Sequence, residues 1–338
     1  MKKRILVTGG AGYIGSHTAW LLNQYGYEVI IIDALLHKQQ FDHSWATCIV
    51  DTLPQALPKL FSNYTFDAVM HFAAHIEVAQ SCITPHEYYS NNVLATQSLL
   101  HACLTAGVKH FIFSSSCAIY GTPQTETLKE DHPQNPLSPY GNTKHVIELL
   151  LKDYAQAYDI NYVSLRYFNA AGALAQHNLY EQHQPETHLL PLLIKAIKNG
   201  SNFNVYGKDY PTHDGTAIRD YIHVLDIAIA HVKALEFLMT TNKSDVFNLG
   251  TGTGYSVLEV VNAAEKILNK QARLVFQPRR TGDAPKLVAD ASKAHSILKW
   301  YPENSSLTTI IESIADLPGG LDQRPHTGFI DSVKSVFH

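Results

Sequence analysis

Three glycines spaced three residues apart constrain the fold of this chain more than any other feature. Gly9, Gly12 and Gly15 follow an apolar run at residues 4–8 and open a segment, residues 12–25, with apolar residues at helical spacing. Such glycines permit a tight turn and let the backbone approach a pyrophosphate at the N-terminus of the helix. The spacing differs from the commoner Gly-x-Gly-x-x-Gly, but it predicts the same dinucleotide-binding turn.

Strand and helix signals alternate through the first half of the chain. Residues 28–33 form a continuous β-branched run, which is typical of a strand buried in a parallel sheet. Further strands are predicted at residues 4–8, 48–51, 68–71, 110–114 and 162–166, and helices at residues 12–25, 85–106 and 140–158. This alternation predicts an α/β fold with a doubly wound parallel sheet of Rossmann type.

The pattern loosens after residue 169. Residues 172–188 are rich in His, Gln, Asn and Glu and predict a loop, and a helix is predicted at residues 224–238. The length of 338 residues suits about two domains. We expect a dinucleotide-binding domain at residues 1–169 and a smaller α/β substrate domain at residues 170–338, interleaved with the first around residues 215–250.

An acidic residue ends the second predicted strand. Asp33 lies eighteen residues after Gly15, close to the distance at which such folds place a carboxylate on the adenosine ribose. A carboxylate there accepts hydrogen bonds from the ribose and repels a 2′-phosphate. Asp33 therefore favours NAD over NADP, and the alternative is an ordinary turn residue.

Tyr140 and Lys144 lie four residues apart within a predicted helix, so their side chains share one face. An ammonium beside a phenol favours the phenolate, and such a tyrosine acts as an acid or base near neutral pH. Lowering the Tyr pKa from about 10 to near 7 requires about 4 kcal/mol, of which Lys144 is expected to supply about half. Alone, the pair is also compatible with a solvated helix face; beside the glycine turn it predicts a catalytic site.

Composition argues against several other classes of function. The net charge of −4 gives no reason to expect nucleic acid or an acidic membrane surface as a partner. No stretch approaches the ~20 apolar residues of a membrane span, and the apolar run after the basic start is too short for a signal peptide. The four cysteines are far apart and are expected to be reduced thiols of a cytoplasmic protein. The nineteen histidines form no metal-binding motif, so no metal site is expected.

Seven short segments resemble the extended short-chain dehydrogenase/reductase superfamily and, within it, the UDP-glucose 4-epimerase family. Three mark the superfamily: VTGGAGYIGSH (residues 7–17), FSSS (113–116) and PYG with Lys144 (139–144). LRYFN (165–169) follows the same pattern. Three are more specific to the 4-epimerases: YPT with DGT (210–216), RDYIHV (219–224) and PRR with GD (278–283). The resemblance extends from residue 3 to about residue 300.

The resemblance implies an isomerase that interconverts UDP-galactose and UDP-glucose through a 4-keto sugar and a tightly bound NAD. Tyr140 would be the base at the 4-hydroxyl, with Lys144 and Ser116 beside it. The residues implied to bind NAD are Gly9, Gly12, Tyr13, Ile14, Gly15, Asp33, Asp51, Phe72, Ala73, Asn91, Ser114, Tyr140, Lys144 and Phe168. Those implied to bind the UDP-sugar are Ser116, Tyr140, Asn169, Leu189, Tyr206, Arg219, Arg280, Asp283 and Leu287. We also expect a homodimer built from the helices at residues 85–106 and 140–158, because both carry more apolar residues than one sheet face needs.

Three departures from the family pattern bear on these expectations. Lys38 and a short loop follow Asp33, where the family usually has Asn and Ser around the ribose. The segment at residues 72–76 lacks a lysine that some members place near the nicotinamide. His188 replaces an amide beside Leu189; His188 and His223 are both expected to be structural.

The sequence bears on three alternative functions. A 4,6-dehydratase needs a carboxylate directly after Ser116, where Cys117 and Ala118 stand instead. An epimerase for another UDP-sugar, such as UDP-GlcNAc or a UDP-pentose, remains open. An inactive NAD-sensing protein is disfavoured because Ser116, Tyr140 and Lys144 are all present. Leu287, smaller than the tyrosine of some members, is expected to leave room for a 2-acetamido group.

Overall fold

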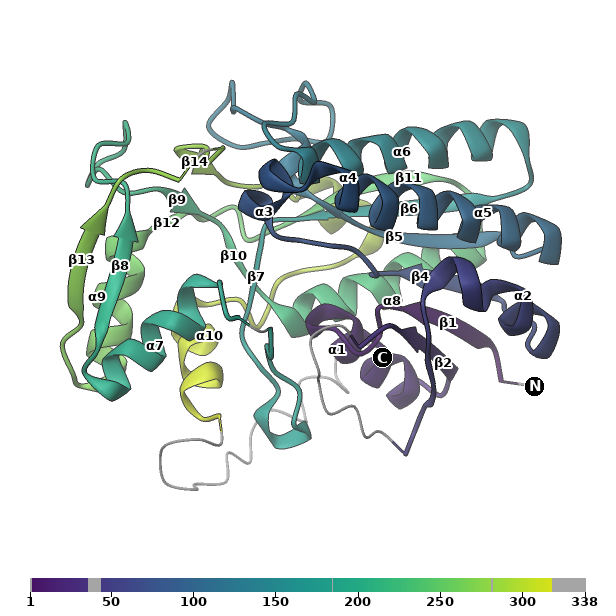
Figure 1. The fold of residues 1–338 in the computed structure, drawn as a ribbon, viewed down its shortest axis with the longest axis horizontal. Coiled ribbons are helices and arrows are strands. Elements are labelled where there is room, and N and C mark those ends of the chain that lie inside the picture. Colours follow the sequence, from purple (N-terminus) through teal and green to yellow (C-terminus); the bar gives the residue numbers. More distant parts are fainter. Residues whose placement is uncertain (1, 36–43, 184, 281, 318–338) are drawn as a thin grey trace.

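A parallel sheet of seven strands, ordered β11-β6-β5-β4-β1-β2-β3, forms the centre of the computed structural model (Figure 1). The structure describes residues 2–35, 44–183, 185–280 and 282–317. The strands of this sheet are β1 (Arg4–Thr8), β2 (Glu28–Asp33), β3 (Thr47–Val50), β4 (Ala68–His71), β5 (His110–Ser116), β6 (Asn161–Tyr167) and β11 (Asp245–Leu249). The predicted α/β doubly wound sheet is confirmed.

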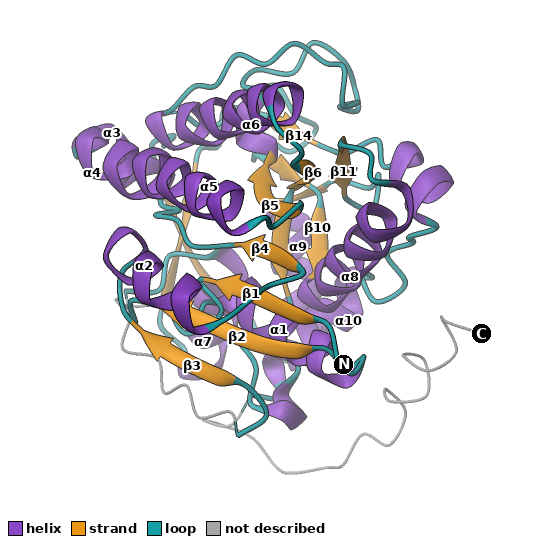
Figure 2. Cartoon of the chain, turned by 90° about the vertical axis from the view of Figure 1, so that its right-hand side faces the viewer, coloured by secondary structure: helices purple, strands orange, loops and turns teal. Residues whose placement is uncertain are grey.

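Helices cover both faces of this sheet (Figure 2). Ile5 and Val7 of β1 pack into one core with α1 and α8, whereas Leu6 packs into a second core with α2, α5 and α6. This alternation follows from the period of two along a strand. The covering helices are α1 (Tyr13–Gln24), α2 (Leu53–Asn63), α3 (Val78–Ile83), α4 (Pro85–Tyr88), α5 (Ala95–Ala106), α6 (Pro139–Ala157) and α8 (Val224–Thr241).

A smaller unit with its own core lies beside the carboxyl ends of the strands, at the left of Figure 1. Its helices are α7 (Leu189–Asn199), α9 (Val257–Leu268) and α10 (Leu307–Ala315). Its short strands are β7 (Asn169–Ala171), β8 (Asn202–Tyr206), β9 (Ile218–Arg219), β10 (Tyr221–His223), β12 (Tyr255–Ser256), β13 (Arg273–Gln277) and β14 (Lys286–Leu287). Between these segments, α8 and β11 return to the large sheet, so the two parts of the chain are interleaved.

The stretch predicted as one long helix at residues 85–106 is interrupted. A π-helical segment, Tyr89–Leu94, separates α4 from α5. Within it, Asn92 is fully buried: its Oδ1 accepts from the His75 N–H at 2.8 Å, and its Nδ2 donates to the His75 carbonyl at 3.0 Å. The wider turn places Asn92 against the loop after β4. π-Helical turns inside α-helices are frequent at functional sites. The periodicity of apolar residues at 85–106 predicts a helix but does not reveal this π-helical interruption.

No helix in the described part of the chain is both long and apolar enough to cross a membrane.

Candidate active site

A cavity of about 1480 Å³ follows the carboxyl ends of β1, β4, β5 and β6 and continues into the smaller unit. The chain order reverses between β1 and β4, and open α/β sheets bind ligands beside such a switch point. A cavity for one drug-sized ligand is roughly 300–1,000 Å³, so this one has room for more than a single small molecule. Every residue that the sequence analysis assigned to the coenzyme or the substrate lines it.

The glycine turn forms one end of the cavity and leaves no space for a side chain at Gly9 or Gly15. Gly9 has a φ of +68°, and a Cβ there would lie 2.5 Å from the Ala73 nitrogen. A Cβ on Gly15 would lie 2.2 Å from the Gly9 carbonyl oxygen. Asp33 lies beside this turn: its carboxylate accepts from the Ala11 N–H at 3.0 Å and the Leu35 N–H at 2.8 Å. The bare backbone, the start of α1 and the held carboxylate fit the diphosphate and ribose of a dinucleotide.

The start of α6 places Tyr140 and Lys144 in the middle of the cavity. Ser138 caps this helix by accepting from the Gly141 N–H at 3.2 Å, and Pro139 occupies its first turn. The Lys144 Nζ donates to the Ser114 carbonyl at 2.8 Å and lies 5.8 Å from the centre of the Tyr140 ring. Both side chains are therefore fixed against β5, and Ser116 lies at the end of that strand.

Burial dominates the ionisation of this pair. It raises the pKa of Tyr140 to about 12, and a hydrogen bond with Ser116 opposes the rise. Burial also lowers the pKa of Lys144 to about 7, against the opposing charge of Glu148. The expected lowering of the Tyr140 pKa by Lys144 is therefore not what the protein groups produce by themselves. Burial is the largest cause of both shifts.

Two arginines from distant segments, Arg219 and Arg280, line the cavity in the smaller unit. Arg219, on β9, lies 3.4 Å from an oxygen of Asp283. The Arg280 guanidinium lies 4.1 Å from the centre of the Tyr206 ring. Leu287, on β14, is in register with Arg219. Guanidinium groups suit a diphosphate, so this end of the cavity has the chemistry expected for a nucleotide-sugar.

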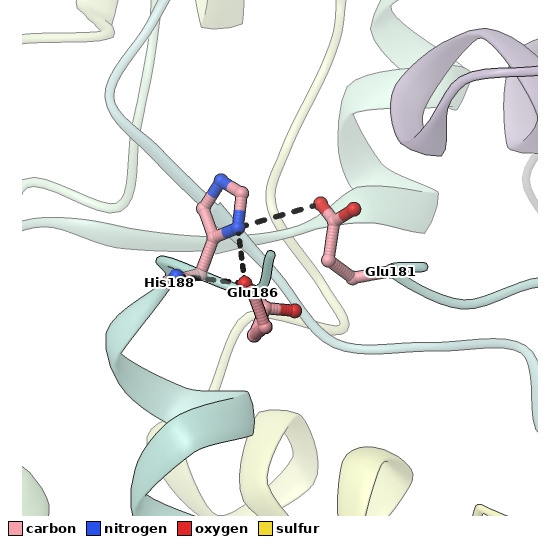
Figure 3. Close-up of side chains that lie close together, drawn as sticks. All are labelled: Glu181, Glu186 and His188. Carbon is pink, nitrogen blue, oxygen red and sulfur yellow. Dashed lines mark hydrogen bonds and ion pairs between the residues drawn. The ribbon is translucent and has the colours of Figure 1, made fainter. Parts of the chain in front are cut away.

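A cluster of one histidine and two carboxylates, of which Glu181 and His188 line the cavity, was missed by the sequence analysis (Figure 3). One oxygen of Glu186 accepts from the Nδ1 of His188 at 2.7 Å, and also from the backbone N–H groups of Thr187 and His188. Glu181 lies 3.8 Å from the same Nδ1. Burial works against the imidazolium, but the hydrogen bond to Glu186 and the charge of Glu181 raise the pKa of His188. These groups satisfy one another, which accords with a structural role for His188.

Tyr167 is a second cavity residue that the sequence analysis did not select. Its hydroxyl is hydrogen-bonded to the Ser114 hydroxyl, and it lines the cavity. It stands two residues before Asn169, so the period of an extended chain could have indicated it. Lys38, at one of the positions where the chain departs from the family pattern, lies outside the described residues.

Comparison with known proteins agrees with this geometry. Residues 5–250 match the model of the NAD dependent epimerase/dehydratase family. The UDP-glucose 4-epimerase of Rhizobium meliloti is 44% identical over 312 residues, covering 91% of this chain and 95% of that protein. The structure of UDP-glucose 4-epimerase from Brucella ovis in complex with NAD has a TM-score of 0.87 at 43% identity, covering 93% of this chain and 97% of that one. The UDP-Glc/GlcNAc 4-epimerase from Campylobacter jejuni has a TM-score of 0.78 at 38% identity, covering 93% and 98%. The chain belongs to the NAD dependent epimerase/dehydratase family.

Proposed function

We propose that this protein is an NAD-dependent isomerase that interconverts UDP-galactose and UDP-glucose by epimerisation at C4. The observation that carries the proposal is the order of groups along one cavity: the glycine turn, then Tyr140, Lys144 and Ser116, then Arg219 and Arg280. Relatives that share most of the chain are UDP-glucose 4-epimerases. Residues 1–169 would bind the coenzyme and residues 170–338 the UDP-sugar.

The reaction assigns one task to each part of the cavity. Tyr140 takes the proton of the 4-hydroxyl and returns it, while Ser116 holds that hydroxyl. NAD held by the glycine turn and Asp33 would supply the reversible hydride transfer at C4, and its positive charge would favour the Tyr140 phenolate that burial opposes. Arg219 and Arg280 anchor the UDP, so the sugar is free to turn over while remote contacts retain it.

The direct test is a panel of UDP-sugars added to the purified protein without coenzyme. We expect UDP-galactose to be converted to UDP-glucose, because a coenzyme that is regenerated in each cycle stays bound. The products are separated by chromatography and identified by NMR. Turnover of none of the panel would contradict the proposal and favour the inactive NAD-sensing alternative.

The coenzyme that leaves the denatured protein is expected to be NAD. The Asp33 carboxylate is held beside the glycine turn and would lie close to a 2′-phosphate. Asp33→Asn removes the charge and should raise the ratio of NADP to NAD retained after reconstitution. Glu28→Gln, at the other end of β2 where Glu28 pairs with Arg4, is the matched control. Mainly NADP in the wild-type extract would contradict this prediction.

A second candidate substrate is UDP-GlcNAc. Leu287 lines the sugar end of the cavity, and the Campylobacter jejuni relative is a UDP-Glc/GlcNAc 4-epimerase. Because leucine is smaller than tyrosine, we expect measurable kcat/KM for UDP-GlcNAc, and a lower ratio of UDP-GlcNAc to UDP-glucose turnover in Leu287→Tyr. Equal ratios in the two proteins would show that residue 287 does not control entry.

We further infer that two copies associate through the helical stretches at residues 85–106 and 140–158. These stretches pack against each other and expose Tyr89 and Leu94 of the π-helical segment and Leu149 of α6. Apolar groups gathered in this way often mark an interface. Light scattering at micromolar protein concentration should give the mass of a dimer. The double variant Leu94→Glu/Leu149→Glu should give a lower mass, because the two carboxylates oppose burial of this surface. Ile297→Glu, another exposed apolar position, is the control.

We place this enzyme in the cytoplasm, where its four free thiols are stable.

A further inference from the structure

A third ionisable residue continues the row of Tyr140 and Lys144 along α6. Glu148 is one further turn on, 7% exposed, and buried against the guanidinium of Arg166, which is 3% exposed. The Arg166 Nε donates to the two Glu148 oxygens at 3.0 and 3.2 Å, and one terminal nitrogen donates at 2.5 Å. The Ser115 hydroxyl donates to the same carboxylate at 2.5 Å.

The Glu148 carboxylate joins α6 to β5 and β6, one helical turn beyond Lys144. Ser115 of β5 and Arg166 of β6 are register partners, and the next pair is Ser116 with Tyr167. Because side chains alternate along a strand, Ser115 and Arg166 face α6 while Ser116 and Tyr167 line the cavity. One helical turn before Glu148, Lys144 donates to the Ser114 carbonyl. Two contacts one turn apart thus set the register of α6 against β5.

Arg166 is itself held firmly. Its second terminal nitrogen donates to the Tyr120 hydroxyl at 2.9 Å and to the Glu130 carbonyl at 2.9 Å. Tyr120 in turn donates to Asn248 at 2.6 Å. The pair is therefore part of a connected buried network, which fixes geometry more strongly than an isolated contact.

The surroundings of Lys144 make the charge of Glu148 important. The packed groups are the neutral His71 of β4, whose pKa burial and Lys144 lower to about 3, and the Phe113 ring of β5 at 4.9 Å. Tyr140 lies on the same helix, and Tyr167 and Arg166 lie on β6. Among these groups, Glu148 is the carboxylate whose charge favours the Lys144 ammonium against burial.

We propose that Glu148 and Arg166 are a positioning pair for the proton transfer: Glu148 holds α6 in register with β5 and supplies the buried countercharge of Lys144, and Arg166 balances Glu148. Neither lines the cavity among the described residues, so both act through Lys144 and Tyr140. The catalytic part of this inference rests on the proposed function.

The first test follows Lys144 directly and needs no turnover. In protein with bound coenzyme and ¹³Cε-labelled lysine, the NMR signal that Lys144→Met removes is titrated with pH. Glu148→Gln leaves Arg166 as an uncompensated cation, so the Lys144 midpoint should fall by about one pH unit or more. Arg166→Gln leaves Glu148 uncompensated, so the midpoint should rise. Midpoints that stay in place, or that move in the same direction in both variants, would overturn the proposal.

The second test measures turnover in the same proteins. The alkaline limb of the kcat–pH profile should move down in Glu148→Gln and up in Arg166→Gln, with little change in KM. Glu148→Asp keeps the charge but shortens the reach, so kcat should fall while the limb stays at the wild-type pH. If the glutamine variants do not fold, Glu148→Asp decides: a fall in kcat at unchanged KM and coenzyme content supports the proposal, and wild-type kcat overturns it. Absence of wild-type turnover would instead contradict the proposed function, while the NMR titration still tests the pair.

Discussion

Tyr140→Phe is expected to reduce turnover of UDP-galactose by about 10²–10⁴-fold or more, the range over which a positioned acid or base contributes. The substitution removes one hydroxyl and keeps the ring, which packs in a buried site at the start of α6. Ser116 is the hydrogen-bonding partner of that hydroxyl, so the fold should change little. The measurements are kcat by product analysis, together with the NAD content and thermal stability of the variant.

Tyr88→Phe is the matched control for this prediction. Tyr88 is also buried near Tyr140, but its hydroxyl donates to the backbone carbonyl of Glu77 at 2.8 Å. Its loss should cost about 1 kcal/mol of stability, as for a single hydrogen bond, and leave turnover close to that of the wild type. If Tyr140→Phe kept a tenth of the wild-type rate, Tyr140 would not be the group that moves the proton.

The large sheet was predictable because its signals are local. Continuous β-branched runs such as residues 28–33 and the glycine turn at residues 9–15 determine strand, turn and helix within a few residues. The interruption at Tyr89–Leu94 was not predictable, because it depends on Asn92 bonding to His75, seventeen residues away in sequence. The small strands β9, β12 and β14 are two residues each and carry no periodic signal; they form because three distant segments pair.

The candidate site likewise contains residues that the sequence predicted and residues that it did not. Residues within recognisable motifs, such as Gly9, Tyr140 and Arg280, all line the cavity. The buried pair of Glu148 and Arg166 was missed because each partner comes from a different element of the fold. Arg166 and Glu148 are eighteen residues apart, and neither motif nor spacing joins them. The direction of the Tyr140 pKa was also missed, because burial depends on packing that the spacing of Tyr140 and Lys144 does not describe.

Lys144→Met should have the second large effect, because it removes the cation beside Tyr140 while filling a similar volume. Lys144 is 2% exposed, its stem is packed in protein, and its Nζ is fixed on the Ser114 carbonyl. Without it the phenolate loses a favourable charge, so we expect the pKa of Tyr140 to rise further. The fraction of phenolate near neutral pH then falls, and we expect kcat to drop by about 10²–10³-fold. The acid limb of the kcat–pH profile should move to higher pH.

Lys152→Met is the control for this variant, since Lys152 is exposed two turns further along α6. It loses the same charge without a change near Tyr140, so both kcat and the pH profile should match those of the wild type. The position of the acid limb separates the electrostatic role of Lys144 from a purely structural one. A structural defect would lower kcat at every pH by a similar factor, whereas loss of the cation is partly offset at high pH, where Tyr140 ionises without help. An unmoved acid limb in Lys144→Met would therefore refute the proposed role of its charge, even if kcat fell.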